Sequence, residues 1–137
     1  MLAQISTRSA PNKHHHSLLR TALLLTTLLL AILQLFTAYR IRAIHHHDEG
    51  RHVEAIADAT ELITMTSPLI KSGIPNAARV TEDNICGLRI RGLSTFKSGD
   101  TPGAIKDLRA ACARERSLGK ELSDTVIQRP SRICSKF

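Results

Sequence analysis

The longest apolar stretch of the chain, residues 21–39, contains no charged side chain. It lies between Arg20 and Arg40, and its eight leucines favour transfer into lipid, whereas Gln34 and several threonines oppose it. A helix needs about 20 such residues to cross the hydrocarbon core of a bilayer. We therefore predict an uncleaved signal anchor, a transmembrane helix over residues 17–39 that contacts the bilayer through residues 21–39.

Two other interpretations of this stretch compete with the anchor. A cleaved signal peptide has a shorter apolar core and small residues before its cleavage site, whereas cleavage after Ala38 places the bulky Phe36 three residues before the cut. A buried helix of a soluble domain needs apolar surroundings on nearly every side, which so short a chain hardly supplies. The absence of acidic residues before Asp48 also fits an organellar targeting segment.

Basic residues lie on both flanks of the predicted span, so the asymmetry that sets orientation is small. Residues 1–16 are a predicted disordered basic tail, and Arg40, Arg42 and Arg51 follow the span. We expect the amino terminus in the cytoplasm or matrix, with residues 40–137 on the non-cytoplasmic side of a bacterial or organellar inner membrane.

Beyond the apolar stretch, one pattern of polar and apolar positions occurs twice, 49 residues apart. Residues 39–63 and residues 88–112 are identical at seven of 25 aligned positions, which is well above chance. The identical pairs are Arg40/Arg89, Ile41/Ile90, Arg42/Arg91, Gly50/Gly99, Ala55/Ala104, Ile56/Ile105 and Asp58/Asp107. The chain therefore contains a duplicated unit.

Each copy predicts two helices joined at a glycine, which is an αα-hairpin. Gly50 and Gly99 suit the left-handed position that follows the last residue of a helix. In the second copy, Thr101 is expected to cap the next helix and Pro102 to occupy its first position, where a missing N–H does no harm. In the first copy, the second helix is expected to end before Pro68.

These turns predict an all-α fold, in which an N-terminal transmembrane helix is followed by two hairpins and a candidate C-terminal capping helix. The second hairpin is expected to begin near Thr81, with Glu82 and Asp83 in its first turn. The predicted segments are a first hairpin over 40–65 that continues from the anchor helix, a connecting loop over 66–80, a second hairpin over 81–118, a capping helix over 119–128 and a basic tail over 129–137.

The two copies resemble the tetratricopeptide repeat, a helix pair with small and large residues at fixed positions. The matching residues are Leu88, Gly92, Gly99, Ala104, Leu108 and Ala111 in the second copy, and Tyr39, Ala43, Gly50 and Ala55 in the first. The chain departs from the family pattern at Ala59, where a large residue is usual, and at Arg42 and Arg91, where leucine is usual. The resemblance covers about residues 37–118 and implies stacked hairpins.

Repeats of this family commonly bind a partner peptide on the inner face of their first helix. The resemblance therefore implies that an acidic segment of a partner is contacted by Arg40, Arg42, Arg89, Arg91 and Thr95. Salt bridges within the chain, for example to Asp58 and Asp107, are the alternative for these arginines. Because three or more repeats are normally needed for stability, two hairpins predict that a protein partner or a second copy completes the packing.

The formal net charge of +7 does not indicate nucleic-acid binding, because of where the charges lie. Residues 39–125 carry 13 basic and 12 acidic side chains, and the excess of positive charge sits at the two ends of the chain. Tyr39 and Phe96 are the only aromatic residues in that middle part, so stacking platforms for bases are also missing. We predict no nucleic-acid partner.

Histidines gather at the turn of the first copy, where His45, His46, His47 and His52 surround Asp48 and Glu49. Consecutive helical residues point about 100° apart, so the histidine triplet cannot converge on one metal ion. Only pairs such as His45 and Glu49, four residues apart, share a face, and a metal would need further ligands. We therefore predict no metal site and no cofactor.

Cys86 and Cys112 lie thirteen residues before and after Gly99, so their backbones are level in an antiparallel hairpin. A disulfide between them is geometrically conceivable and would suit an oxidising compartment. The alternative is that both thiols are reduced and pack as small buried apolar groups, with Cys134 left over in the tail.

The sequence contains no glycine-rich phosphate loop, nucleophile elbow, CxxC or HExxH motif, and we predict that the protein is not an enzyme. The predicted function is a single-pass membrane-anchored interaction module, as an assembly factor or accessory subunit of a membrane complex. The alternatives are a small structural subunit of a large organellar or bacterial membrane complex, or a secreted helical domain that remains after signal cleavage.

Overall fold

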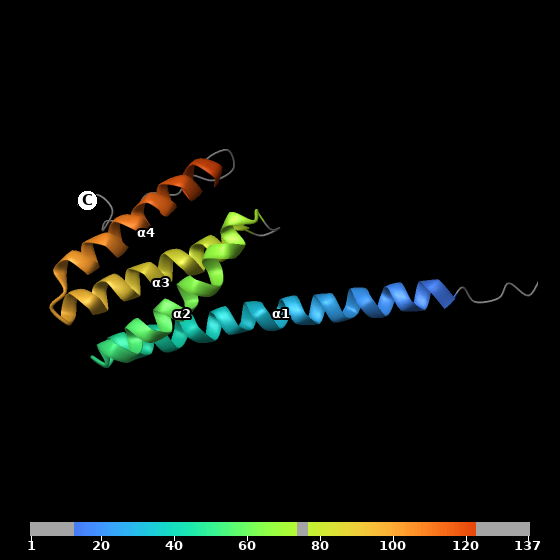
Figure 1. Ribbon diagram of the computed structural model, residues 1–137, viewed down its shortest axis with the longest axis horizontal. Coiled ribbons are helices and arrows are strands. Elements are labelled where there is room, and N and C mark those ends of the chain that lie inside the picture. Colours follow the sequence, from blue (N-terminus) through green and yellow to red (C-terminus); the bar gives the residue numbers. More distant parts are fainter. Residues whose placement is uncertain (1–12, 74–76, 123–137) are drawn as a thin grey trace, which may run out of the picture. The chain divides into compact units, whose positions relative to one another are not determined.

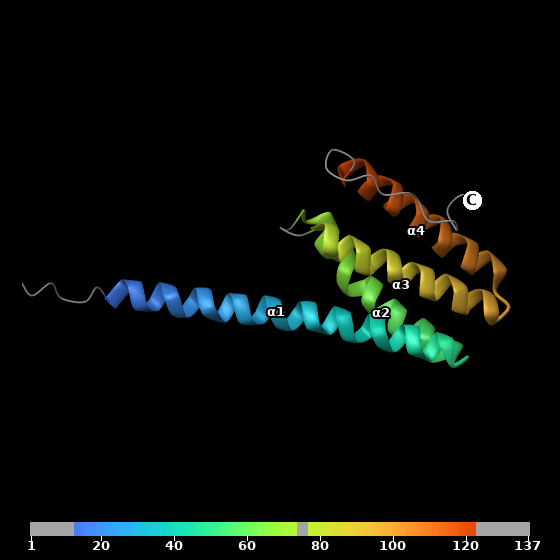
Figure 2. The ribbon, with the colours of Figure 1, turned by 180° about the vertical axis from the view of Figure 1, so that it is seen from behind.

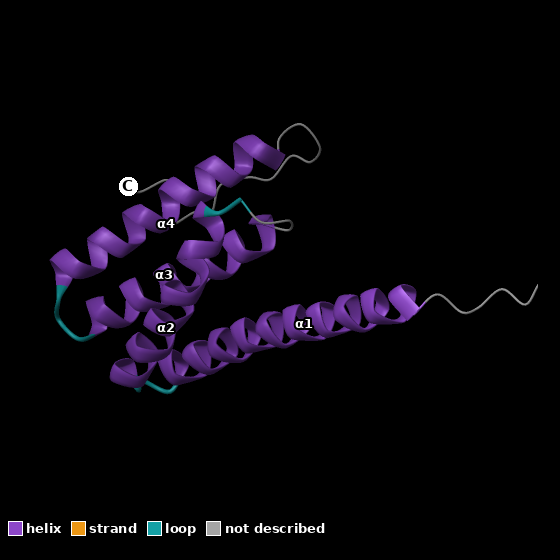
Figure 3. Ribbon diagram, turned by 45° about the vertical axis from the view of Figure 1, so that its right-hand side comes forward, coloured by secondary structure: helices purple, strands orange, loops and turns teal. Residues whose placement is uncertain are grey.

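The computed structural model describes the backbone of residues 13–73 and 77–122. These residues form four helices: α1 (Lys13–Asp48), α2 (His52–Lys71), α3 (Ala77–Lys97) and α4 (Thr101–Leu122). Within the described residues there is no β-strand (Figure 3). The prediction of an all-helical chain that begins with a long apolar helix is confirmed.

The chain divides into two compact units, of which the first ends at Gln34. The described part of this unit belongs to α1, whose segment from Ser17 to Asp48 is long and apolar enough to cross a membrane by length and composition. Its leucines from Leu18 to Leu30 are exposed, as expected of a helix whose apolar side chains have no protein around them. The hydroxyls of Thr21, Thr26 and Thr27 donate hydrogen bonds to carbonyls of their own helix at 2.6–2.9 Å.

The second unit begins at Leu35 and contains the end of α1 together with α2, α3 and α4. We call α1 from Leu35 onward, with α2, the first hairpin, and α3 with α4 the second hairpin. Within this unit α3 lies between α2 and α4 (Figure 1, and from behind in Figure 2). One buried cluster joins α1, α2 and α3 through Ala43, Ala55, Ala59 and Ile90, and another joins α3 and α4 through Ile85, Leu88, Ala111 and Leu118.

The two hairpin turns have the same backbone hydrogen bonds. Gly50 and Gly99 adopt φ values of +74° and +95°, as expected for the left-handed residue after a helix. The amide of Arg51 donates to the carbonyl of His46 at 2.8 Å, and the equivalent amide of Asp100 donates to Thr95 at 3.1 Å. The glycine amides donate to the carbonyls of His47 and Phe96 at 3.1 and 3.0 Å, which completes a Schellman motif in each turn.

α2 continues past the point where the sequence predicted its end. It includes Pro68 and reaches Lys71, so six residues of the predicted loop over 66–80 are helical. A proline this close to a helix end removes one hydrogen bond, but nearby hydroxyls satisfy other carbonyls of the same turn. Thr66 donates to the carbonyl of Leu62 at 2.6 Å and Ser67 to that of Ile63 at 2.7 Å.

The boundaries of the second hairpin also differ from those predicted. α3 begins at Ala77 rather than near Thr81, so the connecting loop is shorter at both ends. α4 is capped by Asp100, whose Oδ1 accepts the amide of Gly103 at 3.0 Å, and Thr101 is already helical. α4 then runs without a break through Gly119 to Leu122, so residues 119–122 continue it; the rest of the predicted capping helix and the basic tail lie outside the described residues.

Replacing Gly99 with alanine tests the conformational requirement of the turn. A Cβ there meets no atom within 4 Å, so the only penalty is the left-handed backbone, and we expect Gly99→Ala to lower the free energy of unfolding by about 1–2 kcal/mol. Gly119→Ala is the matched control, because Gly119 is helical and equally open, and alanine there should stabilise by up to about 1 kcal/mol. Urea unfolding of the full chain in detergent micelles, followed by circular dichroism, measures both. Equal effects at the two glycines would contradict the assignment.

Candidate functional site

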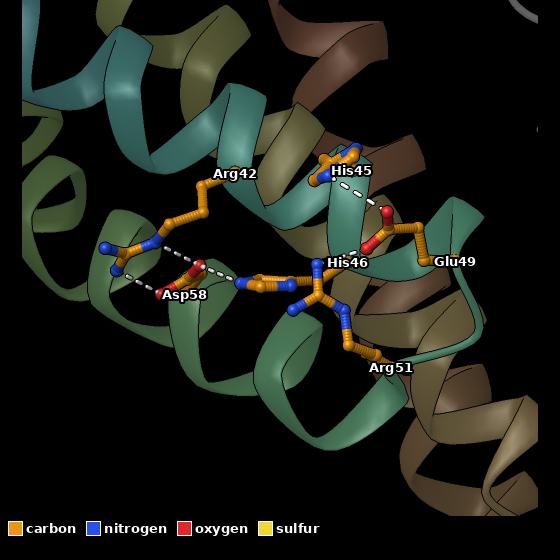
Figure 4. A network of polar contacts seen from close by, with 6 residues as sticks. All are labelled: Arg42, His45, His46, Glu49, Arg51 and Asp58. Carbon is orange, nitrogen blue, oxygen red and sulfur yellow. Dashed lines mark hydrogen bonds and ion pairs between the residues drawn. The ribbon is translucent and has the colours of Figure 1, made fainter.

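The arginines predicted to contact a partner are held by carboxylates of their own chain. Arg42 on α1 donates two hydrogen bonds to Asp58 on α2, from Nε at 2.6 Å and from Nη2 at 2.5 Å (Figure 4). Arg91 on α3 makes the same bidentate contact with Asp107 on α4, at 2.6 and 2.7 Å. Each hairpin is thus closed by one arginine–aspartate clamp at an equivalent position.

The position of each clamp follows from its distance to the turn. Arg42 and Asp58 lie eight residues before and after Gly50, and Arg91 and Asp107 lie eight residues before and after Gly99. Residues that are equally far from the turn of an antiparallel hairpin lie level along the helix axes. Each clamp residue is also seven residues, or about two helical turns, from the residue that flanks the turn glycine on its own helix. The two side chains therefore project from nearly the same side of that helix.

The other two predicted arginines contact different partners in the two hairpins. Arg40 reaches Asp83 on α3 at 2.7 Å, and Arg79 lies 3.7 Å from the same buried carboxylate. Arg89, the equivalent of Arg40, contacts Glu115 on α4 at 2.6 Å. Arg40 therefore joins the first hairpin to the second, whereas Arg89 adds a contact within the second hairpin.

The clamps stabilise the charged form of their arginines. Asp58 and Asp107 are buried, and the hydrogen bonds that Arg42 and Arg91 donate to these carboxylates raise the pKa of both guanidinium groups above the ordinary value. Arg42 additionally lies over the ring of Tyr39, 5.0 Å from its centre. Each bidentate contact fixes the position of one helix of its hairpin against the other.

Thr95, the remaining predicted contact residue, is half-buried on α3. Its carbonyl accepts the amide of Asp100 in the turn. The sequence left two interpretations of the five residues open, and the arginine contacts satisfy the one based on salt bridges within the chain. Partner binding by these residues stays a prediction.

The histidines of the first turn make separate contacts instead of a common one. His46 lies 3.6 Å from Asp58, and His45 lies 3.1 Å from Glu49, which also contacts Arg51 (Figure 4). His47 pairs with the hydroxyl of the buried Ser94 on α3 at 2.8 Å. Among the described residues, no three His, Cys, Asp or Glu side chains come together as a set that could hold a metal ion.

Three exposed apolar side chains of the hairpins were not singled out by the sequence. Ile44 on α1 and Leu93 on α3 are equivalent in the two copies, and both are exposed. Phe96, one turn after Leu93, is exposed as well. The signal that could have identified Ile44 and Leu93 is an apolar residue at the same place in both copies. Phe96 lacks that signal, because its equivalent in the first copy is His47.

The predicted bridge between Cys86 and Cys112 is not formed, because Cys86 is a free cysteine. Its side chain packs beside the cluster of Ala43, Ala55, Ala59 and Ile90, on the side of α3 that faces the first hairpin. Cys112 lies on α4, on the other side of α3, and it is disulfide-bonded. A level position along two helices thus did not make the two side chains face each other.

The clamps predict an unequal cost of removing the two aspartates. Asp107→Asn should lower the free energy of unfolding by about 2 kcal/mol, because the Arg91 side chain is only 25% exposed and keeps its charge without a carboxylate. Asp58→Asn should cost less, because the Arg42 side chain is 57% exposed and water can replace the lost contact. Urea unfolding of both variants in micelles measures the difference. A double-mutant cycle with Arg91→Gln should show positive coupling, and its absence would argue against the clamp.

Cys86 should react slowly with alkylating reagents. Burial is the main cause that raises the pKa of its thiol above the ordinary value, so little thiolate is present at neutral pH. Because the folded state then holds the thiol proton to higher pH than the unfolded chain does, stability should fall as pH rises through the unfolded pKa of about 8.5. Mass spectrometry of the Cys86 peptide after iodoacetamide treatment, with and without denaturant, measures the protection. Equal labelling in both conditions would show that the thiol is accessible.

Comparisons of this chain with protein-family models, with curated proteins and with solved structures find no match. The resemblance of its hairpins to tetratricopeptide repeats accordingly stays a prediction from the sequence.

Proposed function

We propose that the chain is a single-pass membrane-anchored interaction module, without a catalytic role, that serves as an assembly factor or accessory subunit of a membrane protein complex. The observation that carries the proposal is the continuity of α1. One helix contains both the exposed apolar segment of membrane-spanning length and, from Leu35, residues that pack into the helical region. A helix of this kind attaches the hairpins to the bilayer without a flexible linker.

The burial of Phe36 supports an anchor that is retained. Its side chain is fully buried, although it lies inside the apolar stretch. Cleavage after Ala38 would remove it, and loss of a buried phenylalanine typically costs about 3–5 kcal/mol. A mature secreted domain beginning at Tyr39 would thus lack part of the packing of its first helix.

The duplicated hairpins support a role in binding another protein. Equivalent turns and small residues at the helix contacts are what a tetratricopeptide-like unit requires, and such units bind partners rather than transform substrates. Since the arginines are engaged within the chain, we assign the partner contact to the exposed apolar side chains of Ile44, Leu93 and Phe96. The partner is then a subunit of the same membrane with an apolar segment near the bilayer surface.

Two measurements test this proposal. Alkaline carbonate washing should leave the full-length chain in the membrane pellet, and its release would refute the anchor.

Affinity capture from solubilised membranes should recover a defined membrane complex, and Phe96→Ser should reduce the recovery several-fold. Val53→Ser is the matched control, because Val53 is also an exposed apolar residue of the hairpins. Equal loss in both variants, or no complex at all, would contradict the proposal; substoichiometric recovery favours an assembly factor and stoichiometric recovery a structural subunit.

A further inference from the structure

The internal duplication reveals a face of α1 that lacks the neighbour its counterpart has. On α3 the residues Asp83, Gly87, Ile90 and Ser94 are all buried against the first hairpin. Their equivalents on α1, 49 residues earlier, are Gln34, Ala38, Ile41 and His45, and all four are exposed. The contrast also holds at the two identical residues, because Ile41 is 59% exposed and Ile90 is 7% exposed.

The contacts of α3 show what kind of neighbour this face accepts. A Cβ on Gly87 would lie 3.0 Å from Ile63 and 3.3 Å from the carbonyl of Ala59, so α2 approaches α3 closely at a small residue. Next to Gly87, Ile90 of α3 packs on Ala55 and Ala59 of α2. The equivalent small residue on α1 is Ala38, next to Ile41. The open face therefore has the form of a helix-packing surface.

The same four positions are part of a heptad seam that continues towards the amino terminus. Gln34, Ala38, Ile41 and His45 are spaced by four, three and four residues, and Thr27 and Ala31 extend the series in register. Apolar or small residues at this spacing line one side of a helix and pair with another helix in a left-handed crossing. All six residues are exposed. We call this set the α1 seam.

Gln34 indicates that the seam is occupied in the membrane. The threonine hydroxyls of the apolar segment bond to carbonyls of their own helix, but the Gln34 side chain makes no hydrogen bond among the described residues. An amide left without a partner in hydrocarbon is costly, whereas side-chain hydrogen bonds between transmembrane helices stabilise their association. Ala31 and Ala38 lie on either side of Gln34 in the seam, and small residues of this kind let two helix backbones come close.

We propose that the occupant is a second copy of this chain, paired in parallel along the α1 seam with Gln34 facing Gln34. An amide offers both a donor and an acceptor, so two copies related by a twofold axis satisfy each other at the same depth. Two copies also insert in the same orientation. Residues 21–39 carry no charge, and Arg42 beside the seam is paired with Asp58, so the seam from Thr27 to His45 brings no unpaired arginine or lysine together.

This inference rests on the membrane anchoring proposed above, but it does not depend on the proposed partner complex. Sedimentation equilibrium of the purified full chain in detergent micelles, over a range of protein-to-detergent ratios, measures the dissociation constant. Gln34→Leu should raise that constant about three- to thirtyfold, and Ala31→Leu should raise it at least as much. Gln34→Asn keeps an amide and should have an intermediate effect. Circular dichroism should show unchanged helix content in each variant.

Ala22→Leu is the matched control, because Ala22 lies in the same apolar segment nine residues before Ala31 and hence on the opposite face of the helix. It should leave the dissociation constant unchanged. A chain that is monomeric at every ratio would overturn the proposal, as would a dimer that tolerates both Gln34→Leu and Ala31→Leu. Capture of a different membrane protein by a monomeric chain, lost in Gln34→Leu, would assign the seam to another occupant and also overturn it. Release by alkaline washing would instead refute the anchoring itself.

Discussion

The helices of the region from Leu35 have little apolar bulk with which to hold one another, because the whole chain contains one tyrosine, three phenylalanines and no tryptophan. They compensate by coming close together. Gly92 makes room for Leu108, whose Cγ would lie 3.0 Å from a Cβ at that position. In the first hairpin the equivalent pair is Ala43 and Ala59. The second hairpin thus packs a glycine against a leucine where the first hairpin packs two alanines. Close approach is conserved between the copies by different side chains.

The close approach of the helices brings each arginine within hydrogen-bonding distance of its carboxylate. It also removes these pairs from water, which determines how much they contribute to stability. A pair that is largely removed from water gains little net stability, because desolvation offsets most of the attraction. Its geometry is nevertheless demanding, since a bidentate contact allows only one relative position of the two helices. The clamp of each hairpin therefore selects one relative position of its two helices. Without the clamp, their small side chains would permit several such positions. Arg40 and Asp83 likewise select one relative position of the two hairpins.

The sequence predicted those features that depend on local spacing or on a single residue's backbone. The glycine turns could be predicted because few other residues tolerate a positive φ, and the long apolar helix because of its length. Salt bridges from the arginines to Asp58 and Asp107 were an open alternative, and the sequence did not assign the individual pairs. Equal distance from the turn suggested a bridge between Cys86 and Cys112, which is not formed, because level positions do not fix the direction in which two side chains point.

Other features depended on contacts that the sequence does not show. α2 continues through Pro68 to Lys71, and the buried Asn84 of α3 bonds to the hydroxyls of Thr66 and Ser67 just before this proline, at 2.7 and 3.2 Å. This network belongs to two helices at once, so a rule about proline alone could not predict it. The cap at Asp100 was missed for a simpler reason, since Thr101 and Asp100 are both good capping residues and only the backbone chooses between them.

The two equivalent turns differ at one place, and the difference makes the hairpins unequal in local dynamics. Asp100 caps α4 with its carboxylate, whereas the equivalent Arg51 offers α2 no side-chain acceptor. No side chain caps the start of α2, which has only the modest help of Glu54 in its first turn. Fraying should therefore begin at His52 in the first hairpin, while the equivalent start of α4 in the second hairpin stays closed.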